Sequence, residues 1–369
     1  WSTGPDPAIV GRSRRSHDAA LDYLHTVDLL APSPAGLFCA PGGFHVDPWA
    51  PAETAIITHA HADHLRAGCG RYVCAAPSAP LLERRLPPGA RVEGVPYGQP
   101  FDLGGVRLSL HPAGHVLGSA QVRLEGGGQV WVATGDFKRA PDPTCAPFEV
   151  VPCDVLVMEG TFALPIYRWR PGGEVVRDLL AWVEGCAARG RAAVLFCYAL
   201  GKAQRVLAEL AALTDRTVWV HGAMAPLIAE YRAAGVRMLP SALVTEAPAG
   251  TRFAGELVLA PPSAHRSPWL RRLGDLETAL ASGWMRVRGV RRRRGFDRGF
   301  VLSDHADWPA LLRTVRDTGA RRVLVTHGHA DALVRHLREQ GLEAEALATE
   351  FQGEADVYAG FLEPSEQAS

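Results

Sequence analysis

The sequence has no long apolar run and no closely spaced pair of cysteines. None of its 369 residues lies in an uninterrupted apolar segment of 18, so no membrane-spanning helix is expected. The first 30 residues lack the apolar core of a secretory signal peptide. The seven cysteines are scattered and form no Cys-x-x-Cys motif. This pattern predicts reduced thiols in a cytoplasmic protein rather than a disulfide framework.

The chain also has no excess of charge of either sign. Its 39 Lys and Arg residues balance its 39 Asp and Glu residues, which argues against a broadly basic surface but not against a local basic groove. Hydrophobic residues make up 47% of the sequence, as in ordinary globular proteins. The length suits one large domain or two closely associated ones.

The most informative segment is His59-Ala60-His61-Ala62-Asp63-His64, which places four potential metal ligands within six positions. It follows the apolar run 55–57, which predicts a buried strand with the ligands in the loop at its end. Imidazoles and a carboxylate together suit zinc and neighbouring first-row metals. Because a catalytic zinc usually takes three protein ligands, four in one loop predict two adjacent ions.

Three further apolar runs each end in candidate ligands. His111 and His115 follow the run 106–110, Asp136 follows 130–134, and His327 and His329 follow 323–326. A single histidine at the end of a strand is commonly structural. Four strand ends with the same chemistry instead indicate a metal site held by a rigid scaffold.

The two halves of the chain differ in their secondary-structure pattern. Residues 37–133 contain short apolar runs separated by Gly and Pro, which predicts a strand-rich region. From 155 onward, helical periodicity alternates with short apolar strands, as in βαβ units with parallel strands. The last elements, from 299 onward, end again in His and Asp, so we expect them to return to the first domain.

In their order along the chain, the first motifs resemble those of the metallo-β-lactamase fold. The resemblance rests on Asp47 in Val-Asp-Pro-Trp, the segment 59–64, His115 in Gly-His-Val-Leu-Gly and Asp136 in Thr-Gly-Asp-Phe. It implies an α/β protein built as an αββα sandwich with a dinuclear metal site. His59, His61 and His115 resemble the ligands of one metal, Asp63 and His64 those of the second, and Asp136 the bridge between both. Asp47 would orient a ligand histidine, and His111 is the alternative to His115 as third histidine.

The later motifs resemble the β-CASP branch of this fold, whose members cleave nucleic acids. They are Glu159-Gly160-Thr161-Phe162, Ser303-Asp304-His305-Ala306-Asp307 and Thr326-His327-Gly328. The resemblance implies an inserted α/β β-CASP domain and makes His327 the last metal ligand, with His329 as the alternative. The segment 159–169 resembles the bacterial DNA-ligase-associated exonucleases, which are similar to mRNA 3′-end-processing factors and related to crosslink-repair nucleases and Artemis.

The motifs divide the chain into four predicted parts. Residues 1–30 form an N-terminal extension, 31–165 the first part of the metallo-β-lactamase domain, 166–298 the β-CASP domain, and 299–369 the return to the first domain.

The family resemblance also assigns chemical roles. It implies two divalent metal ions, expected to be Zn²⁺ with Mn²⁺ as the alternative, which activate a water for attack on a phosphodiester. Asp63, Asp136, Glu159 and His305 are the expected catalytic residues. His305 would donate a hydrogen bond to the phosphate or protonate the leaving group. Glu159 would orient Asp63 or His305, or else only cap the following segment.

Six residues are predicted to contact substrate phosphates. Lys138 follows Asp136, and Gly201 and Lys202 open a predicted helix whose N–H groups favour anions. Arg291, Arg292 and Arg293 lie in an arginine run shortly before His305. The alternative for Gly201 and Lys202 is an ordinary strand-to-helix turn, and for the arginines a solvated loop.

These observations lead us to expect a DNA exonuclease that acts in repair, with 5′-to-3′ polarity preferred. The expected partners are nucleic acid, with DNA favoured over RNA, and by family resemblance a DNA ligase or helicase; no membrane partner is expected. An RNA-processing nuclease is the first alternative. A small-molecule metallohydrolase or a non-catalytic nucleic-acid-binding scaffold are the others.

Overall fold

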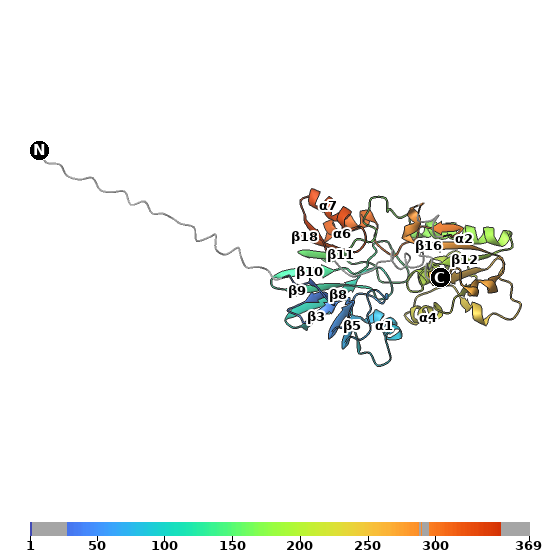
Figure 1. Cartoon of the computed structure of the whole chain (residues 1–369), viewed down its shortest axis with the longest axis horizontal. Coiled ribbons are helices and arrows are strands. Elements are labelled where there is room, and N and C mark those ends of the chain that lie inside the picture. Colours follow the sequence, from blue (N-terminus) through green and yellow to red (C-terminus); the bar gives the residue numbers. More distant parts are fainter. Residues whose placement is uncertain (2–27, 288, 290–294, 348–369) are drawn as a thin grey trace, which may run out of the picture.

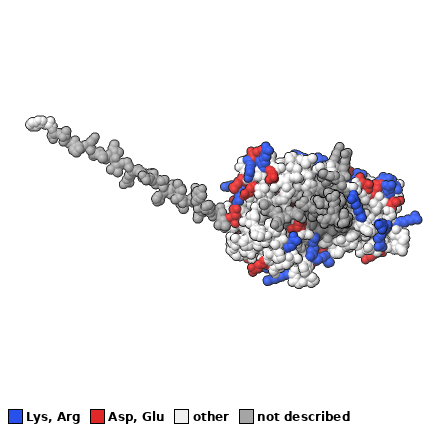
Figure 2. Space-filling view, in the orientation of Figure 1, with Lys and Arg blue, Asp and Glu red and all other residues white. Residues whose placement is uncertain are grey.

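The computed structural model describes residue 1, residues 28–287, residue 289 and residues 295–347. Within these ranges the strands form three sheets, two of them stacked and the third set to one side (Figure 1). Among the described residues, no helix has the length and apolar character needed to cross a bilayer. Acidic and basic side chains are both spread over the described part of the face in Figure 2, in keeping with the zero formal net charge.

The first sheet has six strands in sequence order. They are β1 (Ala31–Ser33), β2 (Gly36–Cys39), β3 (Phe44–Val46), β4 (Thr54–Ile57), β5 (Arg71–Ala75) and β6 (Val92–Val95). From β3 to β6 the strands run parallel. In the central strands β4 and β5 all residues but the first are buried. Since successive side chains of a strand point to opposite sides, both faces of the sheet are covered there.

The second sheet has the order β19-β18-β11-β10-β9-β8-β7. These strands are β7 (Phe101–Leu103), β8 (Val106–Pro112), β9 (Ala120–Gly126), β10 (Gln129–Ala133), β11 (Val155–Glu159), β18 (Arg322–Thr326) and β19 (Glu343–Ala346). Ile56 and Val73 of the first sheet share one core with Val122 and Trp131 of the second. The two sheets are therefore packed face to face.

Helices cover the outer faces of this sandwich. On the first sheet, Leu81 and Leu82 of α1 (Ala79–Arg85) pack with Ile57. On the second, α6 (Trp308–Thr318) and α7 (Ala330–Glu339) bury Leu311 and Leu333. The layers are thus helix, sheet, sheet, helix. Leu29 and Leu30 are buried in the core between the sheets, so the ordered packing already includes the end of the predicted extension.

The third sheet is entirely parallel and has the order β14-β13-β15-β12-β16-β17. Its strands are β12 (Ala192–Phe196), β13 (Val218–Val220), β14 (Ser241–Leu243), β15 (Leu257–Ala260), β16 (Leu276–Ala281) and β17 (Arg298–Phe300). One face packs against α2 (Gly172–Ala188), α3 (Lys202–Leu210) and α4 (Ala225–Ala233). An aromatic cluster around Phe162, Tyr167 and Trp284 lies on the other face.

Five short 3-10 helices complete the described elements. They are η1 (Ala76–Ser78), η2 (Val244–Glu246), η3 (Pro262–Ala264), η4 (Pro268–Leu273) and η5 (Gly283–Arg286).

After the third sheet the chain returns to the sandwich. Strand β18 pairs in parallel with β11 and places Thr326 opposite Glu159, although the two residues are 167 positions apart in the sequence. The predicted αββα sandwich with an inserted α/β domain is confirmed. The predicted boundaries at residues 30, 165 and 298 stay predictions.

Candidate metal centre

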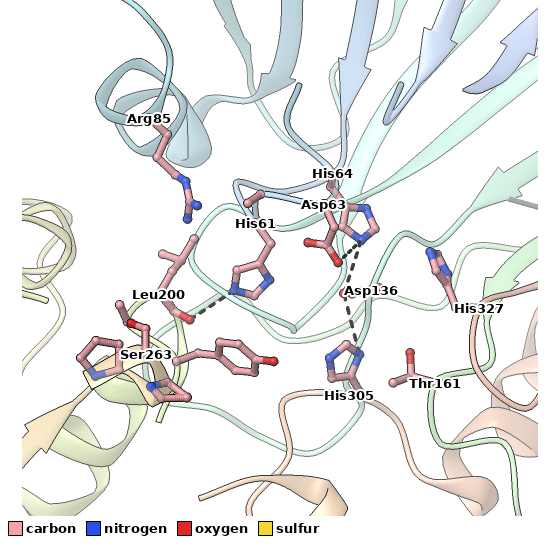
Figure 3. A pocket seen from close by; sticks show the side chains of 15 residues that line it. His61, Asp63, His64, Arg85, Asp136, Thr161, Leu200, Ser263, His305 and His327 are labelled. Atoms are coloured by element: carbon pink, nitrogen blue, oxygen red, sulfur yellow. Dashed lines mark hydrogen bonds and ion pairs between the residues drawn. The ribbon is translucent and has the colours of Figure 1, made fainter. Parts of the chain in front are cut away.

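Loops from both stacked sheets meet at one edge of the sandwich and bring the predicted ligands together (Figure 3). His59, His61, Asp63 and His64 follow β4, His115 follows β8, Asp136 follows β10, and His327 follows β18. The rigid strands therefore fix loops that are otherwise short and irregular. Gly135, before Asp136, has φ +54°, and an added Cβ there would lie 2.5 Å from Thr58 Oγ1. Only glycine fits this close approach of the two loops.

Three imidazole nitrogens and one carboxylate oxygen converge on a single point. His61 Nδ1 lies 3.0 Å from His59 Nε2 and 3.1 Å from His115 Nε2. Asp136 Oδ2 lies 3.6 Å from His59 Nε2 and 3.7 Å from His115 Nε2. All four atoms lie within 4.8 Å of one another. This donor set and number fit a divalent transition metal such as zinc.

Main-chain carbonyls decide which nitrogen of two of these rings faces the cluster. His61 Nε2–H donates to the Leu200 carbonyl at 3.2 Å, and His115 Nδ1–H donates to the Asp304 carbonyl at 2.7 Å. A carbonyl oxygen only accepts, so the other nitrogen of each ring carries the lone pair. Those lone pairs belong to His61 Nδ1 and His115 Nε2, the two atoms that point into the cluster.

The buried carboxylate of Asp47 orients two further histidines. Asp47 Oδ2 accepts from the Thr58 hydroxyl at 2.5 Å, so the Thr58 oxygen accepts from His59 Nδ1–H at 3.0 Å. The same Oδ2 accepts from His64 Nδ1–H at 2.7 Å. Asp47 itself has φ +44°, a backbone conformation that a non-glycine residue rarely adopts away from functional sites.

A second donor set shares Asp136 with the first. His64 Nε2 lies 3.6 Å from Asp136 Oδ2 and 3.9 Å from Asp63 Oδ2. His327 lines the same cavity. Its Nδ1 lies 2.8 Å from Thr326 Oγ1, whose hydroxyl donates to the Met158 carbonyl. His327 Nδ1 is therefore the donor, and its Nε2 has the lone pair that a metal requires.

Burial keeps four of the histidines in the form that binds metals. Desolvation and neighbouring imidazoles hold the pKa values of His59 and His115 well below the usual range. Desolvation lowers the pKa of His61 to about 4 and that of His327 to about 3. Neutral imidazoles are the ligating species, so the rings need no deprotonation before they bind a metal at neutral pH.

His64 shows that the site carries excess negative charge. Burial disfavours its protonation, but the carboxylates of Asp136, Asp63 and Asp47 outweigh burial and raise the pKa of His64 to about 10. Burial also raises the pKa of Asp136 to about 7. A divalent cation would replace the proton of His64 as the counter-charge for these carboxylates.

Glu159 holds His305 beside the metal cluster. His305 Nδ1–H donates to Glu159 Oε2 at 2.8 Å, while Glu159 Oε1 accepts from the Phe137 N–H at 2.8 Å. His305 Nδ1 also lies 3.9 Å from Asp136 Oδ2. Of the roles considered for Glu159, the geometry therefore matches the orientation of His305 rather than of Asp63.

Three residues predicted to contact phosphates lie in the interior instead. Lys138 and Lys202 are buried, with 1% and 0% of the residue exposed, and their ammonium groups lie 3.7 and 3.5 Å from Asp304. The Gly201 N–H donates to Gln204 Oε1 at 2.7 Å, so it is already used within its own helix. The two lysines were predicted as phosphate contacts from their positions beside candidate motifs. The structure shows that they are the counter-charges that the buried Asp304 requires.

Lys138 and Lys202 belong to a buried ion cluster that joins the third sheet to the sandwich. Arg205 of α3 donates to Asp304 Oδ1 at 3.0 Å and to the Ser303 carbonyl at 2.7 Å. Asp142, after β10, pairs with Lys138 and lies 3.7 Å from Arg205. The cluster therefore fixes the loop that carries His305 and the carbonyl that orients His115.

The structure separates the competing histidines. His111 lies on the sandwich surface, where its Nδ1 is 2.9 Å from Glu149, whereas His115 is in the donor cluster. His329 is exposed and stacks against Tyr167, whereas His327 lines the cavity. The predicted phosphate contacts Arg291, Arg292 and Arg293 lie outside the described residues.

Sequence reasoning missed several residues that organise the centre. Thr58 stands directly before His59, and a hydroxyl in that position was a usable signal. Asp304 stands beside His305, so its charge was visible but its burial was not. Leu200 acts through its carbonyl, which every residue possesses, so no side-chain pattern could have found it.

We predict that Asp47→Asn lowers the affinity for metal by roughly 10- to 100-fold. The amide would weaken the hydrogen bonds that Asp47 accepts from Thr58 and His64. Competition with a chromogenic chelator measures the affinity. Asp102→Asn, an exposed position in β7, is the matched control and should leave it unchanged; equal affinities for both variants would contradict the role of Asp47.

We predict that Asp304→Asn destabilises the protein by about 3–5 kcal/mol, because it leaves buried cations without a counter-charge. Urea denaturation measures the effect. The control is Asp317→Asn, which breaks a partly exposed pair with Arg139 and should cost less than about 1 kcal/mol. If both variants lower the free energy of unfolding by the same amount, the buried ion cluster does not stabilise the fold more than a partly exposed pair does.

Comparison with known proteins places this geometry in a family. No protein-family model matches the chain. The chain is 34% identical over 345 residues to "Probable DNA ligase" from Opitutus terrae. The aligned region covers 90% of this chain and 33% of that protein. It is also 33% and 31% identical over 119 residues to the endoribonuclease YSH1 of Saccharomyces cerevisiae and of Eremothecium gossypii, each covering 32% of this chain and 15% of the relative.

The chain thus spans only about a third of the ligase-named relative and a smaller share of the two endoribonucleases. A protein of unknown function from Enterococcus faecalis has the same fold, with a TM-score of 0.54 and 13% identity over 80% of this chain and 79% of its own. Together with the sandwich, the inserted parallel sheet and the ordered motifs, these similarities show that the chain belongs to the β-CASP nuclease family of the metallo-β-lactamase fold.

Proposed function

We propose that the protein is a metal-dependent phosphodiesterase that removes nucleotides from a DNA end. The observation that carries this proposal is the pair of donor sets that share Asp136 at one wall of a cavity. When bound there, two divalent ions would neutralise a phosphate and activate water for its hydrolysis. Zn²⁺ suits the histidine-rich first set, and Mn²⁺ is the alternative for the second, which contains two carboxylates.

The chain's own residues would position the substrate and handle protons. Glu159 holds the proton of His305 on Nδ1, so His305 Nε2 can exchange a proton with a substrate oxygen. His305 lines the cavity with Asp136 and Thr161, which places it within the same space as the reacting phosphate. We therefore infer that His305, when protonated on both ring nitrogens beside the Glu159 carboxylate, uses its Nε2–H to bind the phosphate or to protonate the leaving oxygen.

The size of the cavity supports action on a strand end. Its volume is about 290 Å³, at the lower limit of roughly 300–1,000 Å³ for ligand sites. Its walls come from the sandwich and from the third sheet, through loops that contain Leu200 and Ser263. A base-paired duplex is far wider than such a space, so one unpaired strand fits better than a duplex.

The extent of the similarity to each relative supports DNA over RNA. The alignment with the protein named as a DNA ligase covers 90% of this chain, whereas the alignments with the endoribonucleases cover 32%. If a homologous segment is fused to a ligase, one polypeptide would both trim a DNA end and join it to another. We propose repair of DNA ends as the setting, a ligase as the partner and the cytoplasm as the location; helicase contact stays a prediction.

RNA processing is the second candidate function, and the endoribonuclease relatives favour it. The test is digestion of single- and double-stranded DNA and RNA, each labelled at the 5′ or the 3′ end, with and without a chelator. We expect stepwise loss of label from single-stranded DNA, abolished by chelator and restored by Zn²⁺ or Mn²⁺. Internal cleavage of RNA at higher rates than any cleavage of DNA would overturn the proposal.

We predict that His305→Ala leaves the metal content unchanged and slows cleavage by at least about 100-fold, as for loss of a general acid. Metal analysis and single-turnover rates measure the two effects. The control is His329→Ala, which removes an exposed ring outside the cavity and should retain the activity. Loss of metal from the His305 variant would instead make that ring a ligand.

A further inference from the structure

One basic side chain in the cavity wall belongs to neither donor set of the metal centre. Among the described residues that line the cavity, Arg85 is the one lysine or arginine. Figure 3 shows its side chain extending from the end of α1 toward the cavity, on the side where His61 lies and away from His327. Lys138, Lys202 and Arg205 are instead committed to the buried ion cluster. Arg85 is therefore the described side chain best placed to offer a fixed positive charge to a ligand in this space.

The neighbouring arginine holds the end of α1 in place. Arg84 Nε donates to Glu230 Oε1 of α4 at 2.6 Å, which links α1 of the sandwich to a helix that packs on the third sheet. Consecutive helical residues point in different directions, so Arg85 faces the cavity while Arg84 faces α4. Arg84 forms an ion pair with Glu230. Arg85 is exposed, and its guanidinium forms no such ion pair with another described residue.

The position of Arg85 separates it from the phosphate that is cleaved. In Figure 3, His61 lies between Arg85 and the shared carboxylate of Asp136, and His305 and His327 lie on the far side. The metal donor sets are gathered around Asp136. A nucleic-acid strand carries one phosphate per nucleotide, so when one phosphate lies at Asp136 the next lies away from it. A guanidinium binds such an oxyanion through two parallel hydrogen bonds.

We propose that Arg85 binds a second phosphate of the substrate strand, adjacent to the phosphate that is hydrolysed. This inference rests on the proposed nuclease function and adds a residue that positions the substrate. It makes the site selective for substrates with at least two phosphates, such as oligonucleotides or a nucleotide with a phosphorylated end. A simple diester with one phosphate would gain nothing from Arg85.

The test compares two substrates of the metal-loaded protein: bis(4-nitrophenyl) phosphate, which has one phosphate, and a single-stranded oligothymidylate of five nucleotides with a 5′-phosphate. Arg85→Ala should raise KM for the oligonucleotide about tenfold or more, the usual size of one lost charge-assisted hydrogen bond. Cleavage of the simple diester should be unchanged. Arg85→Lys should restore part of the oligonucleotide affinity, because an ammonium keeps the charge but loses the two-pronged geometry.

The matched control is Arg91→Ala, which removes the same charge from an exposed position after α1 that does not line the cavity. It should change neither substrate. Unchanged metal content and thermal stability of the Arg85 variants confirm that the centre is intact. Equal behaviour of Arg85→Ala and Arg91→Ala would overturn the proposal, and so would an equal loss of rate on both substrates.

A binding measurement distinguishes failure of this proposal from failure of the proposed function. If the protein cleaves neither substrate, fluorescence anisotropy can still measure the affinity of the intact chain, Arg85→Ala and Arg91→Ala for the labelled oligothymidylate. Weaker binding by Arg85→Ala alone would support the phosphate contact and reject only the nuclease function. Absence of binding by the intact chain, or equal binding by all three proteins, would reject the role of Arg85.

Discussion

The organisation of the candidate centre depends on hydrogen bonds made by the ring nitrogens that face away from it. Each imidazole has two nitrogens, and a metal can use only one that has a lone pair. In His61, His64 and His115 the distal nitrogen donates to a carbonyl or a carboxylate, groups that only accept. The converging nitrogens are therefore lone-pair donors before any ion arrives, and little reorganisation would accompany binding.

These acceptors come from parts of the chain that the ligand motifs do not contain. The carbonyl for His61 belongs to Leu200, next to the third sheet, and the carbonyl for His115 belongs to Asp304, on the returning segment. The buried pairs of Asp304 with Lys202 and Arg205 hold these two segments together. The metal centre is thus completed by the inserted domain, although all of the expected ligands follow strands of the sandwich.

The sequence allowed the ligands to be predicted but not their supports. His59, Asp63 and Asp136 follow apolar strands, and both the strand pattern and the ligand chemistry are local properties of the sequence. Burial is not local: Lys138 and Lys202 are basic residues beside candidate motifs, and only the packed structure shows that they neutralise Asp304. The same applies to β11 and β18, whose pairing across the inserted domain brings His327 to Asp63.

The distribution of charge explains why the cavity wall needs an exposed cation. Burying a carboxylate is costly unless a positive group compensates it. Lys138, Lys202 and Arg205 neutralise Asp142, Asp304 and Glu209, so these three cations are committed to carboxylates other than Asp63 and Asp136. Bound cations would supply that compensation and would be shared with the phosphate that reacts. Among the described residues that line the cavity, Arg85 is then the one lysine or arginine that could meet a further phosphate of a strand.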